Sequence, residues 1–263
     1  MSTNKKAWIN LIFFVITLAV NALGATGVIN GLTQKEISDQ FVTLITPSPS
    51  TFSIWSVIYI LLLLSIVMMV ARKNDPYYTK AVEEITPLFI ISCLLNIAWI
   101  VTFSFVLVEI SVLFILAFFI ALVLICLKLL KINDGKHWLL PVTFGMYAGW
   151  LLIASVVNIA AALVKINWNG FGISEVNWAI IILIVAILLL ILIQTQIRNA
   201  IFPLPVAWAY FGIYQYLRSP EGFNGQYAQL ETVAIIGAAI LVLVAIASFI
   251  INRWWFLPKQ KSA

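Results

Sequence analysis

The residues of this chain that could carry chemistry are amide and aromatic side chains set inside long apolar segments. They are Asn21, Trp55, Tyr59, Asn96, Trp99, Tyr147, Trp150 and Asn158. Indole and phenol rings can stack on a flat molecule, and amides can form hydrogen bonds with it. The alternative for each asparagine is a structural hydrogen bond between helices, because an amide in apolar surroundings needs a partner. These residue types therefore indicate either a binding pocket or interhelical packing.

Their spacing places several of them on shared helix faces. Asn96 and Trp99 are three positions apart, and Trp150, Ala154 and Asn158 follow one another at intervals of four. Residues three or four apart lie on the same side of an α-helix. Both stripes belong to segments expected to run in the same direction, so Trp99 and Asn158 should lie near the same end of the molecule. We predict one pocket, lined by both stripes and by the aromatic and amide residues of the first two apolar segments.

The loop 31–51 precedes the segment that carries Trp55 and ends in the run TPSPST. Pro47 and Pro49 stiffen this run, because proline fixes φ. Loops longer than about 12 to 15 residues are usually functional or disordered. We predict that Pro47, Pro49 and Phe52 belong to a lid over the pocket, with a disordered loop as the alternative.

The composition shows what must position these residues. Hydrophobic residues make up 63% of the 263 residues and charged residues 10%, and the mean hydropathy is +1.08. A soluble domain carries roughly 25% charged residues, so this inventory cannot build a water-soluble surface. A helix needs about 20 apolar residues to cross a bilayer, and eight segments approach that length: 8–30, 52–71, 86–106, 110–130, 138–164, 177–197, 200–217 and 231–251.

The fold class predicted from these segments is an all-α, polytopic membrane bundle with about eight transmembrane helices. Segment 200–217 is the shortest, and Pro203 and Pro205 near its start leave a kinked span or a re-entrant segment as alternatives. The lysines and arginines support an even number of crossings, because cytoplasmic loops are enriched in them. With eight spans, one side receives Lys5, Lys6, Arg72, Lys73, Lys80, Lys128, Lys131, Lys136, Arg198, Arg253, Lys259 and Lys261, and the other only Lys35, Lys165 and Arg218. This split predicts cytoplasmic N- and C-termini.

Six tryptophans lie at predicted span ends, where indole rings prefer the membrane interface: Trp8, Trp138, Trp168, Trp178, Trp254 and Trp255.

Several function classes are disfavoured. Cys93 and Cys126 lie inside apolar runs without metal-ligand spacing, and a single histidine, His137, cannot form a zinc site. Walker, HExxH and GxSxG motifs are absent from the sequence, so no catalytic or metal-binding residue is assigned. No charge lies near the centre of a span, which argues against ion-coupled transport. The net charge of +5 is explained by basic anchors that face lipid headgroups, so no nucleic acid partner is expected.

Four stretches resemble, in the same order, the TspO/MBR family of tryptophan-rich sensory proteins, also called translocator proteins. The run from Pro47 to Tyr59 resembles the family's proline loop and Phe-x-x-x-Trp-x-x-x-Tyr helix, and LLNIAW at 94–99 resembles its Leu-Asn-x-x-Trp helix. The segment 141–158 is similar to the family's fifth helix, although Ile153 stands where the family often has Phe. The fourth stretch is the region around Asn21 and Gly24. The resemblance covers residues 8–166.

The resemblance implies a five-helix core that encloses a hydrophobic pocket under the first loop. On the matching positions, Trp55 and Trp150 would be pocket aromatics, and Asn96, Trp99, Ala154 and Asn158 would line the pocket or support its walls. The family's ligands imply a tetrapyrrole such as protoporphyrin, bound as a ligand and not as a required cofactor. Stacking on Trp55 and Trp150 would hold such a macrocycle, with its carboxylates directed towards Lys35 or Lys165. The implied location is a bacterial cytoplasmic membrane.

Three functions are compatible with these sequence features. The first is a membrane sensor or receptor for a hydrophobic planar ligand, which is the leading hypothesis. The second is a small-molecule transporter without ion coupling, and the third a light- or oxygen-dependent activity that degrades bound porphyrin; an enzyme is the less favoured class. The expected partners are the lipid bilayer and a hydrophobic small molecule, with a homodimer left open.

The predicted organisation has three parts: a core at 8–166, three additional helices within 167–252, and a cytoplasmic tail at 253–263. Trp208, Tyr210 and Tyr214 in the additional helices would extend the pocket if those helices contribute to it.

Overall fold

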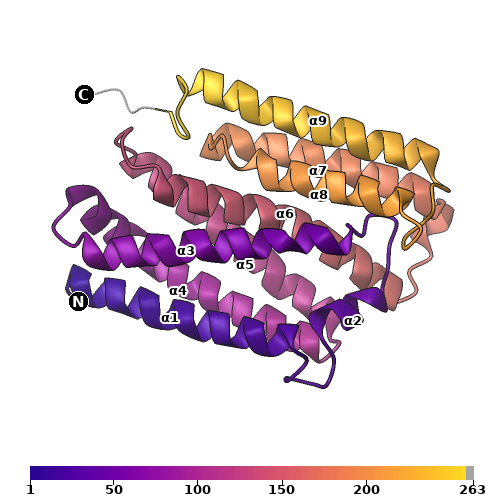
Figure 1. Ribbon diagram of the computed structural model, residues 1–263, viewed down its shortest axis with the longest axis horizontal. Helices are drawn as coiled ribbons and strands as arrows, with labels where there is room; N and C mark the ends of the chain where they lie inside the picture. Colours follow the sequence, from indigo (N-terminus) through magenta and orange to yellow (C-terminus); the bar gives the residue numbers. More distant parts are fainter. Residues whose placement is uncertain (259–263) are drawn as a thin grey trace.

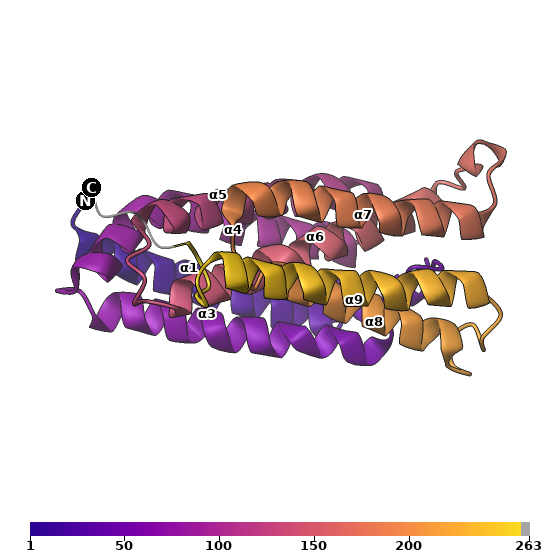
Figure 2. The same cartoon turned by 90° about the horizontal axis from the view of Figure 1, so that it is seen from above.

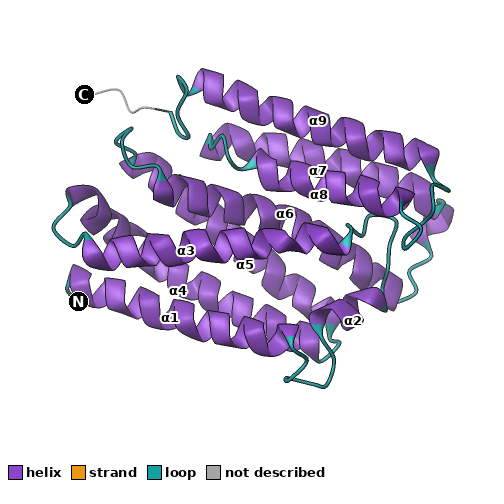
Figure 3. Cartoon of the chain, viewed as in Figure 1, coloured by secondary structure: helices purple, strands orange, loops and turns teal. Residues whose placement is uncertain are grey.

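The long apolar segments form helices, because backbone N–H and C=O groups in a bilayer must be satisfied within the chain. The computed structural model describes residues 1–258, and within this range it is helical with no strands (Figures 1 and 3). The eight predicted segments correspond to α1 (Thr3–Ala25), α3 (Ile54–Ala71), α4 (Pro76–Ser104), α5 (Val108–Ile132), α6 (Leu139–Lys165), α7 (Glu175–Ile197), α8 (Pro203–Arg218) and α9 (Ala228–Ile251). The predicted fold class is confirmed.

Seven of the helices in residues 1–258 are long and apolar enough to cross a membrane, and α8 is the helix that falls short. α8 has 16 residues, which corresponds to about 24 Å. Residues 199–202 form a turn before Pro203, in which Asn199 Nδ2 donates to the carbonyl of Pro141 at 2.7 Å. The predicted span 200–217 is therefore wrong at its start, because the turn occupies residues that the length criterion assigned to the helix.

The turn packs closely on α6. A Cβ atom at Gly149 would lie 2.2 Å from the carbonyl oxygen of Phe202, so only glycine permits this contact. α8 then runs back along α9, and α9 in turn packs against α7. α1 begins at the same end of the bundle where α9 ends (Figures 1 and 2). The chain thus passes along the bundle an even number of times, although one of the passes is short.

α6 is the most buried of the seven long helices and lies at the centre of the arrangement. α4 packs against α1 and α5, whereas α7, α8 and α9 form a layer on α5 and α6, on the side away from α1 (Figure 1). The loop after α1 contains two short helices, α2 (Gln34–Asp39) and the 3-10 helix η1 (Pro49–Ser53). A capping box between Thr33 and Glu36 starts α2.

The start of the predicted tail packs back onto the bundle. The backbone N–H of Ala200 donates to the carbonyl of Phe256 at 2.9 Å, and Leu257 is buried. The last residues of the tail, which include Lys259 and Lys261, lie outside the described residues.

Candidate functional site

A cavity of about 310 Å³ lies beneath the first loop, between α2, η1 and the ends of α3, α4, α6 and α8 that face this loop. Most of the predicted site residues line it: Pro47, Pro49, Phe52, Trp55, Trp99, Trp150, Ala154 and Asn158. The cavity lies within the volume range typical of small-molecule sites, which is about 300–1,000 Å³. The two helix stripes and the proline loop therefore meet at one void.

Three indole rings form the aromatic wall. The ring of Trp55 stacks on that of Trp99, with centroids 6.2 Å apart and planes inclined by 24°, and meets the ring of Trp150 edge-on at 6.1 Å. The ring of Phe52 also meets that of Trp150 edge-on, with centroids 6.0 Å apart. Trp55 and Trp99 are half-buried, whereas Trp150 is only 2% exposed. Part of Trp55 and of Trp99 therefore remains exposed beside the cavity.

The buried indole of Trp150 has an unused hydrogen-bond donor. Its Nε1–H has no partner among residues 1–258, and the same holds for the Nε2 group of Gln34 on α2. Both residues line the cavity. A buried donor without a partner costs about 1–3 kcal/mol, and a ligand acceptor would remove that cost.

Asn158 holds Trp99 in place. The Nε1–H of Trp99 donates to Asn158 Oδ1 at 2.8 Å, and Asn158 Nδ2 donates to Ser111 Oγ at 3.1 Å. These bonds join α4, α5 and α6. Asn158 thus combines both interpretations offered for the asparagines, since it lines the cavity and also connects helices.

Four predicted pocket residues lie behind the cavity and do not line it: Asn21, Tyr59, Asn96 and Tyr147. Tyr59 Oη donates to Asn21 Oδ1 at 2.8 Å, and Asn21 Nδ2 donates to Asn96 Oδ1 at 2.6 Å. Asn96 Nδ2 in turn donates to the hydroxyl of Tyr147 at 3.1 Å. This geometry supports the structural alternative for these residues, because their polar groups form hydrogen bonds with one another. The rings of Tyr59 and Tyr147 support Trp55 from behind, with centroids 5.4 and 5.9 Å away.

Helix α8 fastens the first loop over the cavity. The backbone N–H of Ser48 donates to the carbonyl of Gly212 at 3.0 Å, and the indole N–H of Trp208 donates to the carbonyl of Thr51 at 2.9 Å. A Cβ atom at Gly212 would lie 1.9 Å from Thr51 Oγ1, so the close approach requires glycine. The loop and α8 therefore form one packed unit.

α8 contributes to the cavity through residues other than the expected Trp208, Tyr210 and Tyr214. Ala209 and Tyr216 line the cavity, whereas Trp208 bonds the loop. Tyr210 is fully buried and its hydroxyl donates to the carbonyl of Leu183 at 2.5 Å. Tyr214 accepts a hydrogen bond from Arg218 at 2.6 Å. Trp208 and Tyr210 thus join α8 to the first loop and to α7, whereas Ala209 and Tyr216 face the cavity.

The cavity mouth carries one opposite-charge pair. Lys35 and Asp39 both line the cavity and are joined by a salt bridge along α2. The hydrogen bond with the Asp39 carboxylate raises the pKa of Lys35 above its ordinary value. The other lysine predicted to face ligand carboxylates, Lys165, does not line the cavity, because it bonds Glu109 at 2.6 Å and the carbonyl of Val106 at 2.6 Å.

A family model described as TSPO-like protein matches residues 7–247. The chain belongs to the TSPO-like protein family. The resemblance predicted from residues 8–166 is thereby confirmed, and the match extends through α7 and α8 and into α9. Comparisons with curated proteins and with solved structures gave no match.

Other lining residues of this TSPO-like protein were missed by the sequence reasoning. Phe103 lies four positions after Trp99, and Ile153, Val157 and Ala161 continue the stripe that begins at Trp150. Helical spacing was a sufficient signal for these four. Gln34, Ser38 and Asp39 come from α2, whose only sequence signal was the capping pattern at Thr33 and Glu36. Within residues 1–258, no group of three or more His, Cys, Asp or Glu side chains could hold a metal ion.

Proposed function

We propose that this TSPO-like protein is a membrane receptor for a flat, mostly apolar small molecule of the porphyrin type, bound in the cavity beneath the first loop. The observation that carries the proposal is the meeting of Trp55, Trp99 and Trp150 on one cavity. Stacking on an aromatic ring contributes about 0.5–1.5 kcal/mol beyond the burial of apolar area. Three indoles at one void favour a ligand with a large planar surface.

The polar groups of the cavity favour a ligand with acceptors at its edge. Trp150 Nε1–H and Gln34 Nε2 are donors without partners among the described residues. Lys35 offers a positive charge at the mouth, although an incoming carboxylate would share this charge with Asp39. A planar ring with a few oxygen or nitrogen acceptors and a peripheral carboxylate satisfies all three features.

The fastening of the loop by α8 favours binding over free passage. A ligand would enter past a loop held by hydrogen bonds to Gly212 and Trp208. A receptor should bind its ligand without net uptake into proteoliposomes, whereas a transporter should accumulate or exchange it.

We infer the orientation in the membrane from the charges at the two ends. Ten basic residues in the described part lie at the end where α1 begins: Lys5, Lys6, Arg72, Lys73, Lys80, Lys128, Lys131, Lys136, Arg198 and Arg253. Lys35, Lys165 and Arg218 lie at the other end, near the cavity. This asymmetry supports a cytoplasmic location for the basic end and its termini, and an outward-facing cavity.

Titration of the purified full-length protein with protoporphyrin in detergent micelles tests the function. We expect saturable quenching of tryptophan fluorescence with a shift of the porphyrin absorbance band. Ala154→Leu fills the cavity without removing an indole and should weaken binding by about tenfold or more. Trp8→Phe, which alters an exposed indole near the first residue of α1, is the matched control and should bind like the wild type.

Two results would contradict the proposal. One is an unchanged absorbance spectrum at saturating porphyrin. The other is equal affinity in Ala154→Leu and Trp8→Phe, provided that both variants keep the thermal stability of the wild type.

A further inference from the structure

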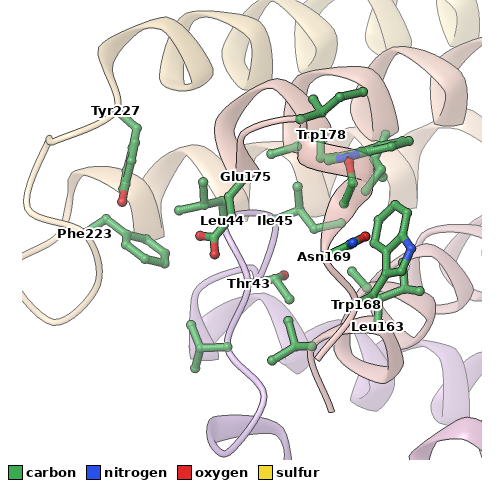
Figure 4. A pocket seen from close by; sticks show the side chains of 17 residues that line it. Thr43, Leu44, Ile45, Leu163, Trp168, Asn169, Glu175, Trp178, Phe223 and Tyr227 are labelled. Carbon is green, nitrogen blue, oxygen red and sulfur yellow. The ribbon is translucent and has the colours of Figure 1, made fainter. Parts of the chain in front are cut away.

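A second cavity, of about 470 Å³, lies at the same end of the bundle as the first. Its walls are residues 42–45 of the first loop, the last turns of α6, the turn before α7, and the loop between α8 and α9 (Figure 4). The residues that line it are distinct from those of the first cavity throughout the described chain. It is therefore a separate chamber, and part of its lining comes from α7 and from the loop between α8 and α9.

Two aromatic pairs face this cavity from different parts of the chain. Trp168 and Trp178, expected from the sequence to be interface anchors, lie with their centroids 4.9 Å apart. Phe223 and Tyr227 meet edge-on at 5.5 Å in the loop before α9. Figure 4 shows the two pairs on different sides of the chamber. All four rings are half-buried, so each keeps part of its surface uncovered.

The tryptophan pair is held by a defined turn. The Nε1–H of Trp178 donates to the carbonyl of Gly170 at 2.7 Å, and a Cβ atom at Gly170 would lie 3.0 Å from that nitrogen. The φ angle of Gly170 is +62°, and the Asn169 side chain accepts a hydrogen bond from Phe171 N at 3.1 Å. The turn thus fixes the position of the Trp178 ring before any ligand arrives.

Glu175 is the one acidic or basic side chain among the described residues that line this chamber. Its carboxylate makes no hydrogen bond or ion pair within residues 1–258, and in Figure 4 it points into the space between Phe223 and Trp168. Apart from Lys35 on α2, the basic residues at this end of the described chain are Lys165 and Arg218. Both pair with other glutamates: Lys165 with Glu109 at 2.6 Å and Arg218 with Glu231 at 3.8 Å. A glutamate in the first turn of a helix is favourable by itself. That preference does not explain the aromatic walls around it.

We propose that this chamber binds a free, lipophilic alkylammonium cation. The ammonium group would lie between the Glu175 carboxylate and the aromatic faces, because the face of an aromatic ring attracts a cation. The apolar body of the ligand would rest against Leu44, Ile45 and Ala179, which also line the chamber. An anionic ligand is disfavoured, because the lining offers it a carboxylate and no basic side chain.

Calorimetric titration of the full-length protein in maltoside micelles with benzyltrimethylammonium tests this inference. Neopentylbenzene, in which carbon replaces the charged nitrogen, is the neutral probe of the same shape. We expect saturable binding of the cation that is at least about tenfold tighter than that of the neutral probe. Glu175→Gln keeps the size of the side chain and should reduce cation affinity about tenfold, towards that of the neutral probe.

Three controls make the result specific. Glu221→Gln removes an exposed negative charge at the same end, outside the chamber, and should leave cation affinity unchanged. Trp168→Leu should weaken binding even though Glu175 is retained. Ala154→Leu, which fills the first cavity, should not affect the cation, so failure of this inference is distinguishable from failure of the porphyrin proposal.

Equal affinity for the cation in wild type and Glu175→Gln, or equal affinity for the two probes, would overturn the inference. A repeat in micelles that contain lysophosphatidylcholine separates two sources of an alkylammonium group. Unchanged affinity supports a free cation. Reduced affinity would overturn the proposal that the ligand is a free cation, and would indicate that the chamber binds the choline headgroup of a lipid.

Discussion

The indole N–H of Trp208 donates a hydrogen bond to the backbone carbonyl of Thr51 at 2.9 Å, across 157 positions of the chain. This bond joins α8 to the loop that covers the tryptophan-lined cavity. Together with the contact between Gly212 and Thr51, it makes the C-terminal helices part of the site's construction. Residues beyond 166 therefore help to hold the loop that covers the first cavity.

Loss of the Trp208 hydrogen bond should loosen the loop. In Trp208→Phe the ring remains but the donor is removed, at a cost of about 1 kcal/mol. Hydrogen exchange of the amides of residues 48–53 should become about fivefold faster, because their local opening is less costly. Mass spectrometry of the purified protein measures this rate. Trp138→Phe, which alters an exposed indole at the opposite end, is the matched control, and equal exchange in the two variants would contradict the role given to Trp208.

The amide and phenol cluster behind the cavity should contribute to stability. Asn96→Leu removes the acceptor of Asn21 and the donor to Tyr147 and should lower the free energy of unfolding by about 1–2 kcal/mol. Tyr59→Phe removes only the bond to Asn21 and should cost less. A double-mutant cycle, followed by thermal denaturation in detergent, should give a coupling energy of about 0.5 kcal/mol or more. Strict additivity would show that the bonds do not act as a cluster.

The stability of the first turn of α2 should decrease at acidic pH. Hydrogen bonds from the backbone N–H and hydroxyl of Thr33 to Glu36, at 2.7 and 2.8 Å, lower the pKa of the Glu36 carboxyl below its ordinary value of 4.5. Because the pKa is lower in the folded state, the stabilisation is present above pH 4.5 and is lost as the pH falls through the folded pKa. Carbon NMR titration should find the Glu36 pKa below 4.5 in the wild type and closer to 4.5 in Thr33→Val. An unshifted Glu36 would argue against the capping box.

The orientation can be tested by labelling single introduced cysteines. Cys93 and Cys126 are buried and should not react with a membrane-impermeant maleimide. Gln226→Cys, exposed at the cavity end, should be labelled in intact cells. Lys136→Cys, exposed at the opposite end, should react only after lysis. The reverse pattern would place the basic end outside.

Much of the architecture was predictable, because length and apolarity alone select membrane helices. The indoles of Trp99 and Trp150 could be brought together from helical spacing, since each residue lies on a stripe of fixed period. The sequence could not predict that Asn158 lines the cavity whereas Asn96 lies behind it, because this difference depends on how α4 and α6 are rotated about their axes. The early turn before Pro203 was also hidden, because it depends on the close approach of Phe202 to Gly149.

The two chambers share one piece of backbone. Residues 42–45 form a wall of the larger chamber, and the directly following residues 46–52 contribute to the tryptophan-lined one. A ligand that displaces one of these two loop segments would also move the other, because the two segments are consecutive in the chain. The occupancies would be thermodynamically linked only for ligands that move this loop, and each such ligand would change the other's affinity by the same factor. A side chain that fills the first cavity from α6, as in Ala154→Leu, leaves the loop in place and produces no such linkage.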